Sequence, residues 1–396
     1  MTQLLPLDEA QRRLLDIARP LGADPVPVEA SLGRYLASDL AAKRTQPAGD
    51  MSAMDGYAVR DAGPWRVVGE SAAGRPYAGE LPPGAAVRIS TGALMPDGAT
   101  AVLLQEEAAR AGDALMAATG SEPSSRHIRR RGFDFAEGDV VLRAGTRIGP
   151  AQLALAIAAG TTVLETGRLP RLAVLDSGDE LVASGEGWEA HQLPASNGAM
   201  IAAMAASFAA SIERLGPVAD RMDAFAEALA KAETADVIVT TGGASVGDHD
   251  LVRPALEAWG ATIDFWRVAI RPGKPLLVAR KGETFVLGLP GNPVSSYVTA
   301  FLFLLPLLRR LGGANECLPH PLVARTTAEL PAGSSRREFL RAHLEGATVS
   351  PIDERDSSAL RALAGANALI DRPVDAPAVP AGGKVPVYWL KNGGIA

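Results

Sequence analysis

A glycine-rich stretch at 241–250 brings together residue types that bind phosphate and divalent metal. The β-branched run Val237–Thr240 precedes it and predicts a buried parallel strand. The candidate groups of the stretch are Gly242, Gly243, Ser245, Gly247, Asp248 and Asp250. Glycines allow backbone N–H groups to approach an anion, and neighbouring carboxylates suit a Mg²⁺ ion that bridges to its oxygens. A turn without a ligand is the open alternative.

Two other predicted strands end in polar turns. Leu172–Leu175 runs into an acidic turn, and Phe285–Leu289 runs into a proline-rich one. The polar or rigid residues of these turns are Ser177, Glu180, Pro290, Asn292, Pro293 and Ser295. For Asn292 and Ser295, a helix cap and a ligand contact are both open. Because the carboxyl ends of parallel strands share one edge of a sheet, we predict a common anion and metal crevice there.

Cations and a second acidic turn complete the candidate chemistry. Lys274 lies between a glycine and a proline, and Arg267 and Arg271 precede it, so all three are candidates for holding an oxyanion. Solvated surface cations are the alternative, as for the basic cluster at 126–131. Asp55 precedes a glycine, and on this pattern alone a structural Asx turn is favoured.

The elements that must position these residues divide the chain into four predicted domains. From residue 170 strands and helices alternate, which predicts a mostly parallel sheet with helices on both faces. Short strands between Gly and Pro turns predict two small β domains. The predicted domains are 1–42 with 132–169 (discontinuous, N-terminal), 43–131 (inserted, β), 170–316 (α/β) and 317–396 (C-terminal, a small β-barrel).

Three helices are specific expectations. Ser31–Leu40 is predicted as a helix capped by Ser31. Ala151–Ala159 is apolar nearly all round and is therefore expected to be buried. The longest apolar run, Tyr297–Leu308, is 12 residues long, too short for a bilayer, and is expected to be a core helix.

Composition narrows the class of protein. With 396 residues and a net charge of -6, the chain is expected to be a multidomain globular protein that does not bind nucleic acid. Its one cysteine, Cys317, excludes an intrachain disulfide and is typical of a cytoplasmic protein. No signal peptide or membrane span is predicted.

Five motifs in order resemble one family. They are Ser52–Ala58, Ser177–Leu181, Thr241–Gly247, Pro272–Pro275 and Gly288–Pro293. Together they resemble molybdopterin molybdenumtransferase, the bacterial relative of the gephyrin E domain, over essentially the whole chain. The resemblance implies a four-domain homodimer that takes molybdate and adenylyl-molybdopterin and, with Mg²⁺, releases AMP and inserts molybdenum.

The resemblance also implies roles for particular residues. Catalytic roles are implied for Asp55, Glu180, Asp220, Asp250 and Lys274, with Glu180, Asp248 and Asp250 as metal ligands. Substrate contacts are implied for Thr91, Arg341 and Ser357 in addition to the turn residues named above. Asp55 and Thr91 would reach the site of the other subunit. The chain departs from the family pattern at Arg267 and Arg271, where many relatives have lysine.

Two other functions stay open at this point. A molybdopterin adenylyltransferase has a similar α/β domain and glycine loop, and it is also a possible partner protein. A gephyrin-like scaffold would use the same fold to anchor other proteins.

Overall fold

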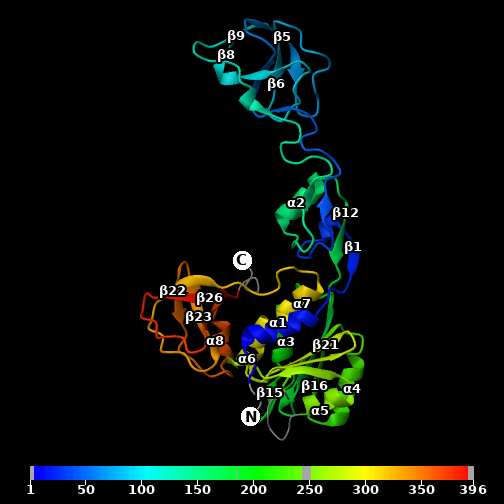
Figure 1. Cartoon of the computed structure of the whole chain (residues 1–396), viewed down its shortest axis with the longest axis vertical. Coiled ribbons are helices and arrows are strands. Elements are labelled where there is room, and N and C mark those ends of the chain that lie inside the picture. The colour runs from blue at the N-terminus through cyan, green and yellow to red at the C-terminus, as the bar shows by residue number, and fades with distance from the viewer. Residues whose placement is uncertain (1–3, 184, 243–250, 391–396) are drawn as a thin grey trace.

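The computed structural model describes residues 4–183, 185–242 and 251–390, and the chain is strongly elongated (Figure 1). A β unit lies at one end, a small mixed unit lies in the middle, and an α/β layer with a β-barrel beside it forms the other end. This arrangement confirms the predicted fold class. The boundaries between the domains stay a prediction.

The central element is a six-stranded sheet in the order β16-β13-β17-β21-β20-β18. Its strands are β13 (Arg171–Ser177), β16 (Ser211–Val218), β17 (Val237–Thr241), β18 (Thr262–Trp266), β20 (Leu277–Lys281) and β21 (Thr284–Leu289). The first four in spatial order pair in parallel, and β20 and β18 add two antiparallel pairings at one edge. Every residue of β17 is buried, as expected for a strand covered on both faces.

Helices cover both faces of this sheet. One core joins the sheet to α1 (Leu7–Ile17), α3 (Asn197–Ala205), and the long helix made of α6 (Pro293–Thr299), a π-helical turn (Ala300–Leu304) and α7 (Leu305–Leu311). The second core joins the opposite face to α4 (Met222–Lys231) and α5 (Val252–Ala258). Apolar side chains on each helix therefore fix the sheet between two layers.

The long helix is the centre of the larger core. Pro306 has no N–H to donate to the carbonyl of Leu302 one turn earlier, and the Gln11 side chain of α1 donates to that carbonyl at 2.9 Å. Pro293–Leu311 is long and apolar enough to cross a membrane by length and composition alone, but 89% of its most apolar window is buried inside the protein. That burial indicates a core helix, as predicted from the sequence.

The middle unit is built from two chain segments, one before and one after the far β unit in sequence. In it β1 (Ala23–Pro27) pairs with β12 (Val163–Gly167), and β2 (Leu40–Ala41) pairs with β11 (Val140–Leu142), both antiparallel. A short helix, α2 (Pro150–Ala158), packs beside them, and a 3-10 turn, η1 (Val28–Ala30), follows β1.

The β unit at the far end of the molecule is built on a single six-stranded sheet. The far unit is a curled sheet in the order β7-β4-β6-β5-β9-β8, which we call the upper β unit. Its strands are β4 (Gly56–Val59), β5 (Trp65–Ser71), β6 (Ala85–Ile89), β7 (Ala101–Leu104), β8 (Ala108–Ala111) and β9 (Ala114–Ala117). Two short strands, β3 (Met51–Ser52) and β10 (Ile128–Arg129), pair at its entrance.

The barrel closes through a pairing of β23 with β25. Its strands are β22 (Leu322–Thr326), β23 (Arg337–Glu345), β24 (Thr348–Pro351), β25 (Ala368–Arg372) and β26 (Lys384–Trp389), with the short helix α8 (Leu360–Ala364) between β24 and β25. Strand β19 (Ile270–Arg271) of the α/β region pairs in parallel with the start of β23. The barrel is therefore joined directly to the chain segment that carries Arg271.

Three sequence predictions were wrong or incomplete. Ser31–Leu40 is not a helix: Gly33 has a φ of +83°, which ends any helical run, and the Ser31 hydroxyl donates back to the Val28 carbonyl. The predicted helix near 151–159 exists, but Ile157 is 50% exposed, so it is not buried all round. Strand β16 went unpredicted because an edge strand alternates with polar residues and lacks a long apolar run.

Candidate functional site

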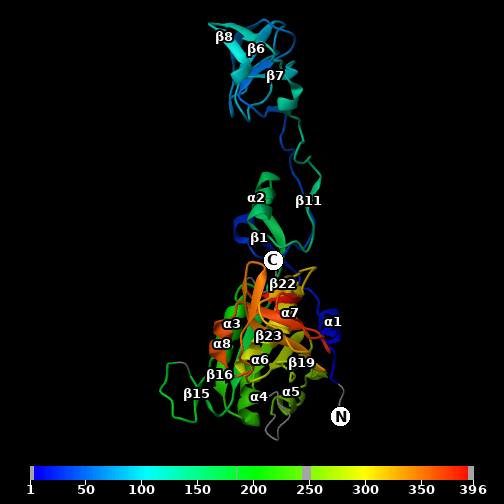
Figure 2. The same ribbon diagram turned by 90° about the vertical axis from the view of Figure 1, so that its left-hand side faces the viewer.

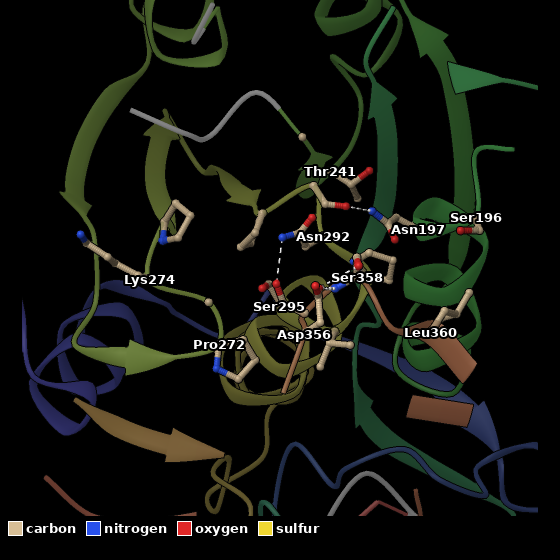
Figure 3. A pocket seen from close by; sticks show the side chains of 18 of the residues that line it. Ser196, Asn197, Thr241, Pro272, Lys274, Asn292, Ser295, Asp356, Ser358 and Leu360 are labelled. Carbon is tan, nitrogen blue, oxygen red and sulfur yellow. Dashed lines mark hydrogen bonds between the residues drawn. The ribbon is translucent and has the colours of Figure 1, made fainter. Parts of the chain in front are cut away.

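A large cavity of about 1380 Å³ opens where the sheet strands β13, β17 and β21 end and the barrel faces them. We call it the strand-end cavity; its wall includes Ser177, Thr241, Pro290, Arg341 and Ser357. Figure 3 looks into it, with Lys274 at one side, Asn197 at the other, and Asp356 and Ser358 below Asn292. The crevice predicted at the carboxyl edge of the sheet is thus present as a cavity.

A buried carboxylate connects the strand ends that form the cavity floor. Asp176 is only 4% exposed, and its Oδ1 accepts from Thr241 Oγ1 at 2.6 Å and from the Gly198 N–H at 2.8 Å. These bonds join the ends of β13 and β17 to the start of α3. Gly198 is required there, because a Cβ at this position would lie 2.2 Å from Asp176 Oδ2.

Gly242 is the one glycine of the 241–250 stretch within the described residues, and it is also packed tightly. Gly242 has a φ of +101°, and a Cβ on it would lie 2.5 Å from the Ser177 carbonyl oxygen. Only glycine fits this close approach between two strand ends. The other loop residues predicted as ligands, Gly243, Ser245, Gly247, Asp248 and Asp250, lie outside the described residues.

Two of the carboxylates that line the cavity come from turns at the ends of sheet strands. Glu180 and Asp220 follow β13 and β16, and the Asp220 N–H donates to Asp179 Oδ1 at 2.9 Å, which ties the two turns together. Carboxylate oxygens are ligands that suit Mg²⁺. Within the described ranges no group of three or more acidic, histidine or cysteine side chains is placed to hold a metal. A fuller set of ligands would therefore need Asp248 or Asp250.

The third loop presents a helix start to the cavity. Pro293 is the first residue of α6, as predicted, and Asn292 stands at the cap position without making a side-chain cap. Instead Asn292 Nδ2 donates to Ser357 Oγ of the barrel at 2.8 Å. Ser295 lines the cavity although it is only 6% exposed. Asn292 is therefore a bridge between the α/β layer and the barrel.

Cations also line the wall of the cavity. Lys274 is exposed there, and Arg271 lies 3.5 Å from Glu338 in an ion pair. Arg267 is not part of this wall: its guanidinium lies over the Trp266 ring, 4.6 Å from the ring centre. A cation–π contact of this kind orients an arginine by the ring face.

Two further cations on this wall were missed from the sequence. Arg336 and Arg355 both line the cavity. Arg336 directly precedes β23, which pairs with the Arg271 segment, and Arg355 lies in the loop that carries Ser357. Both arginines stand among other polar and charged residues, so nothing local distinguishes them from surface residues. The available signals were the strand that begins just after Arg336 and the two serines that follow Arg355 in its loop.

Arg341, for which the resemblance implies a substrate contact, lines the cavity and also holds one of its loops. Its guanidinium donates to the carbonyls of Glu354, Asp356 and Ala359, and it is 4% exposed. We call the segment these carbonyls belong to the 354–359 loop. Burial, offset in part by Glu354 and Asp356, lowers the pKa of Arg341 below its ordinary value. Arg341 therefore holds a loop of the cavity wall.

Asp55 and Thr91 lie together, but far from the strand-end cavity. Asp55 Oδ1 accepts from the Thr91 N–H at 2.7 Å and from Thr91 Oγ1 at 3.2 Å. The Thr91 N–H, followed by its hydroxyl, lowers the pKa of Asp55 below its ordinary value. Both residues belong to the upper β unit, which Figures 1 and 2 place at the opposite end of the chain from the sheet.

Several residues of the basic cluster at 126–131 make contacts within the upper β unit, close in sequence to Asp55. Arg130 pairs with Asp50 at 2.6 Å, and the Arg131 N–H donates to the same carboxylate. The His127 carbonyl accepts from Ala53, two residues before Asp55.

Comparison with known families covers nearly the whole chain. Residues 5–160 match the family described as the MoeA N-terminal region (domain I and II), and residues 173–310 match a probable molybdopterin binding domain. Residues 323–390 match the MoeA C-terminal region (domain IV). The three matches follow the order of the middle and upper units, the α/β layer and the barrel.

Relatives of known name and structure agree with these matches. The chain is 33% identical to the molybdopterin molybdenumtransferase of Bacillus subtilis, over 98% of this chain and 94% of that protein. It is 33% identical to the Haemophilus influenzae protein of the same name, over 85% of each chain. It resembles the crystal structure of the molybdopterin biosynthesis moeA protein of Pyrococcus horikoshii OT3, with a TM-score of 0.84 and 27% identity over 97% of this chain and 99% of that one.

Proposed function

Because the chain belongs to the molybdopterin molybdenumtransferase (MoeA) family, we propose that it inserts molybdenum into molybdopterin. Its substrates are molybdate and adenylyl-molybdopterin, and its products are the molybdenum cofactor and AMP. The gephyrin-like scaffold and the adenylyltransferase are weaker proposals, since relatives that bear the transferase name align with the chain from end to end.

The observation that supports this function best is that carboxylates and cations line the same strand-end cavity. Glu180 and Asp220 line it from the turns after β13 and β16, and Arg271, Lys274 and Arg336 line it from the segments around β19 and the start of β23. Carboxylates and cations around one cavity suit a substrate with a metal-bound phosphoanhydride, together with a second oxyanion. Molybdate is such an oxyanion, and arginine forks and lysine ammonium groups bind it through charge and hydrogen bonds.

The chain's own groups would act by holding these anions in place. In the adenylate, water attacks phosphorus, the bridging P–O bond breaks, and AMP and the molybdopterin phosphate separate. Lys274 and Arg271 would stabilise the negative charge that develops on the bridging and terminal oxygens. Glu180 and Asp220, with Asp248 or Asp250, would hold Mg²⁺, which neutralises phosphate charge when bound.

Asp55 and Thr91 enter this proposal through a homodimer. Within one chain they lie at the far end from the strand-end cavity, so they contribute only if the upper β unit of a second copy reaches it (Figure 2). Both residues are exposed and hydrogen-bonded to each other, which suits a polar contact at the mouth of that cavity. We further propose that the protein is cytoplasmic and receives its adenylylated substrate from a molybdopterin adenylyltransferase.

The test is AMP release from adenylyl-molybdopterin, with molybdate and Mg²⁺ each added or withheld. The proposal expects release that needs both and that yields active cofactor. Consumption of ATP with molybdopterin would instead favour the adenylyltransferase. No release from a folded protein that binds molybdopterin would leave the scaffold role.

Mixed dimers test the shared site. Asp55→Ala and Glu180→Ala are each expected to lose most AMP release, because each removes one half of every site. Heterodimers of the two variants carry one intact site and are expected to recover up to half of the wild-type rate. Confirmed heterodimers without recovery would contradict a site built from two subunits.

A further inference from the structure

Arg355 is a cation on the wall of the strand-end cavity that no other described residue engages. It is exposed, it lines the cavity, and its side chain makes no hydrogen bond or ion pair within the part of the chain that the structure describes. Most arginines with such freedom are solvated surface groups. The loop around Arg355 distinguishes it from those.

The acids on either side of Arg355 are turned onto the backbone of their own loop. Glu354 Oε1 accepts from the Asp356 N–H at 2.7 Å. Asp356 Oδ1 accepts from the N–H and the hydroxyl of Ser358, each at 2.8 Å. An arginine between two acids would ordinarily pair with one of them. Here both carboxylates accept hydrogen bonds from their own loop instead. The N–H donors of the Arg355 guanidinium therefore remain available to a ligand.

The backbone around Arg355 is fixed from two directions. Arg341 donates to the carbonyls on both sides of it, those of Glu354 and Asp356. From the α/β layer, the Val294 N–H donates to the Ser357 carbonyl at 3.0 Å, and Asn292 donates to its hydroxyl. The buried Arg341 guanidinium and the first turn of α6 thus both hold the 354–359 loop. The position of Arg355 at the cavity is therefore preorganised, which lowers the entropic cost of a contact made there.

We propose that Arg355 binds a tetrahedral oxyanion of the substrate in the strand-end cavity and so helps to determine which anion the site accepts. This inference rests on the proposed function and adds a substrate contact to it. The planar fork of arginine matches two oxygens of one tetrahedral anion, which a lysine ammonium does not. Molybdate and the phosphoanhydride of the adenylate both present such oxygens, so each is tested separately.

The test compares Arg355→Gln and Arg355→Lys with Arg361→Gln. Arg361 is an exposed arginine on α8, six residues further along, and it is not part of the cavity wall. Equilibrium binding is measured with molybdate and with AMP as probes. In turnover, KM and kcat are measured for molybdate and for adenylyl-molybdopterin.

For Arg355→Gln we expect Kd and KM to rise about tenfold or more for one of the two anions. Arg355→Lys should fall between this variant and wild type, and Arg361→Gln should match wild type. A rise for molybdate alone would assign Arg355 to the metal oxyanion, and a rise for AMP and adenylate would assign it to the phosphoanhydride.

Three results would overturn the inference: values for Arg355→Gln equal to those of Arg361→Gln, a change confined to kcat, or a wild-type protein that binds neither probe and shows no saturation by either substrate. Failure of the proposed function is separate. A wild-type protein that releases no AMP but loses anion binding in Arg355→Gln would refute the insertase activity and leave the oxyanion contact standing.

Discussion

Asp176 provides the most discriminating test of how the strand-end cavity is held together. Both of its strong hydrogen bonds end on the same oxygen, Oδ1, and come from Thr241 Oγ1 and the Gly198 N–H. Asp176→Ala removes both and leaves two buried donors without a partner. Hydrogen bonds to a charged group contribute about 1.5–3 kcal/mol each, so we expect a local loss of about 3–6 kcal/mol for the two.

Asp176→Asn is the matched control. An asparagine in the same rotamer keeps an acceptor oxygen in the place of Oδ1 and can accept both bonds. It loses the charge and places an amide where Oδ2 now lies, 3.9 Å from the Arg214 guanidinium. We expect about 1.5–3 kcal/mol of loss, since neutral hydrogen bonds are roughly half as strong as charge-assisted ones.

Amide hydrogen exchange followed by mass spectrometry is the suitable assay. A chain with several hydrophobic cores need not unfold in one step, so a single unfolding free energy is poorly defined. Peptides that cover β13, β17 and the start of α3 report the local opening free energy directly. Protection in the upper β unit should stay unchanged in both variants.

Two results would refute this reasoning. Asp176→Ala with wild-type protection in β17 and α3 would show that the two bonds do not hold these ends together. Equal losses in Asp176→Ala and Asp176→Asn would show that charge, and not acceptor geometry, is what matters.

Three further predictions concern other parts of the structure. Arg341→Lys should raise hydrogen exchange in the 354–359 loop and lower AMP release at least tenfold, because one ammonium cannot donate along all three guanidinium directions. Gly242→Ala should destabilise the end of β17 by about 2 kcal/mol or more, through its positive φ and the contact with the Ser177 carbonyl, as measured by exchange there. Asp236→Asn should lower the protection of β13 and β17 from amide exchange at pH 7 but not below the pKa of Asp236.

The sign of the last prediction follows from the surroundings of Asp236. Burial raises its pKa, but the Arg171 N–H and the guanidinium groups of Arg171 and Arg168 outweigh burial and lower it below the ordinary 3.8. Its stabilising effect is therefore present above the unfolded pKa and is lost as pH falls through the folded one. A difference in protection that does not shrink as the pH falls below 3.8 would contradict this. Wild-type exchange in Arg341→Lys or in Gly242→Ala would contradict the other two predictions.

Local sequence patterns predicted most elements of the α/β layer and the strands of both β units. The β-branched run at Val237–Thr240 is buried on both faces, and the proline at 293 starts a helix, because each pattern has one favourable solution. Patterns failed at Ser31–Leu40, where a capping residue and apolar neighbours resemble a helix but Gly33 prevents one. They also failed at β16, whose stability comes from pairing with β13.

The sequence by itself determined the family, the order of the domains, and the strand ends at which the cavity forms, because motifs and periodicity are local. Only the tertiary structure decided which side chains meet. It placed Arg336 and Arg355 in the cavity wall, used Arg341 on loop carbonyls, turned Arg267 onto Trp266, and kept Asp55 at the far end of the chain. The physical reason is that a polar side chain's role depends on which donors and acceptors surround it, and those come from segments far away in sequence.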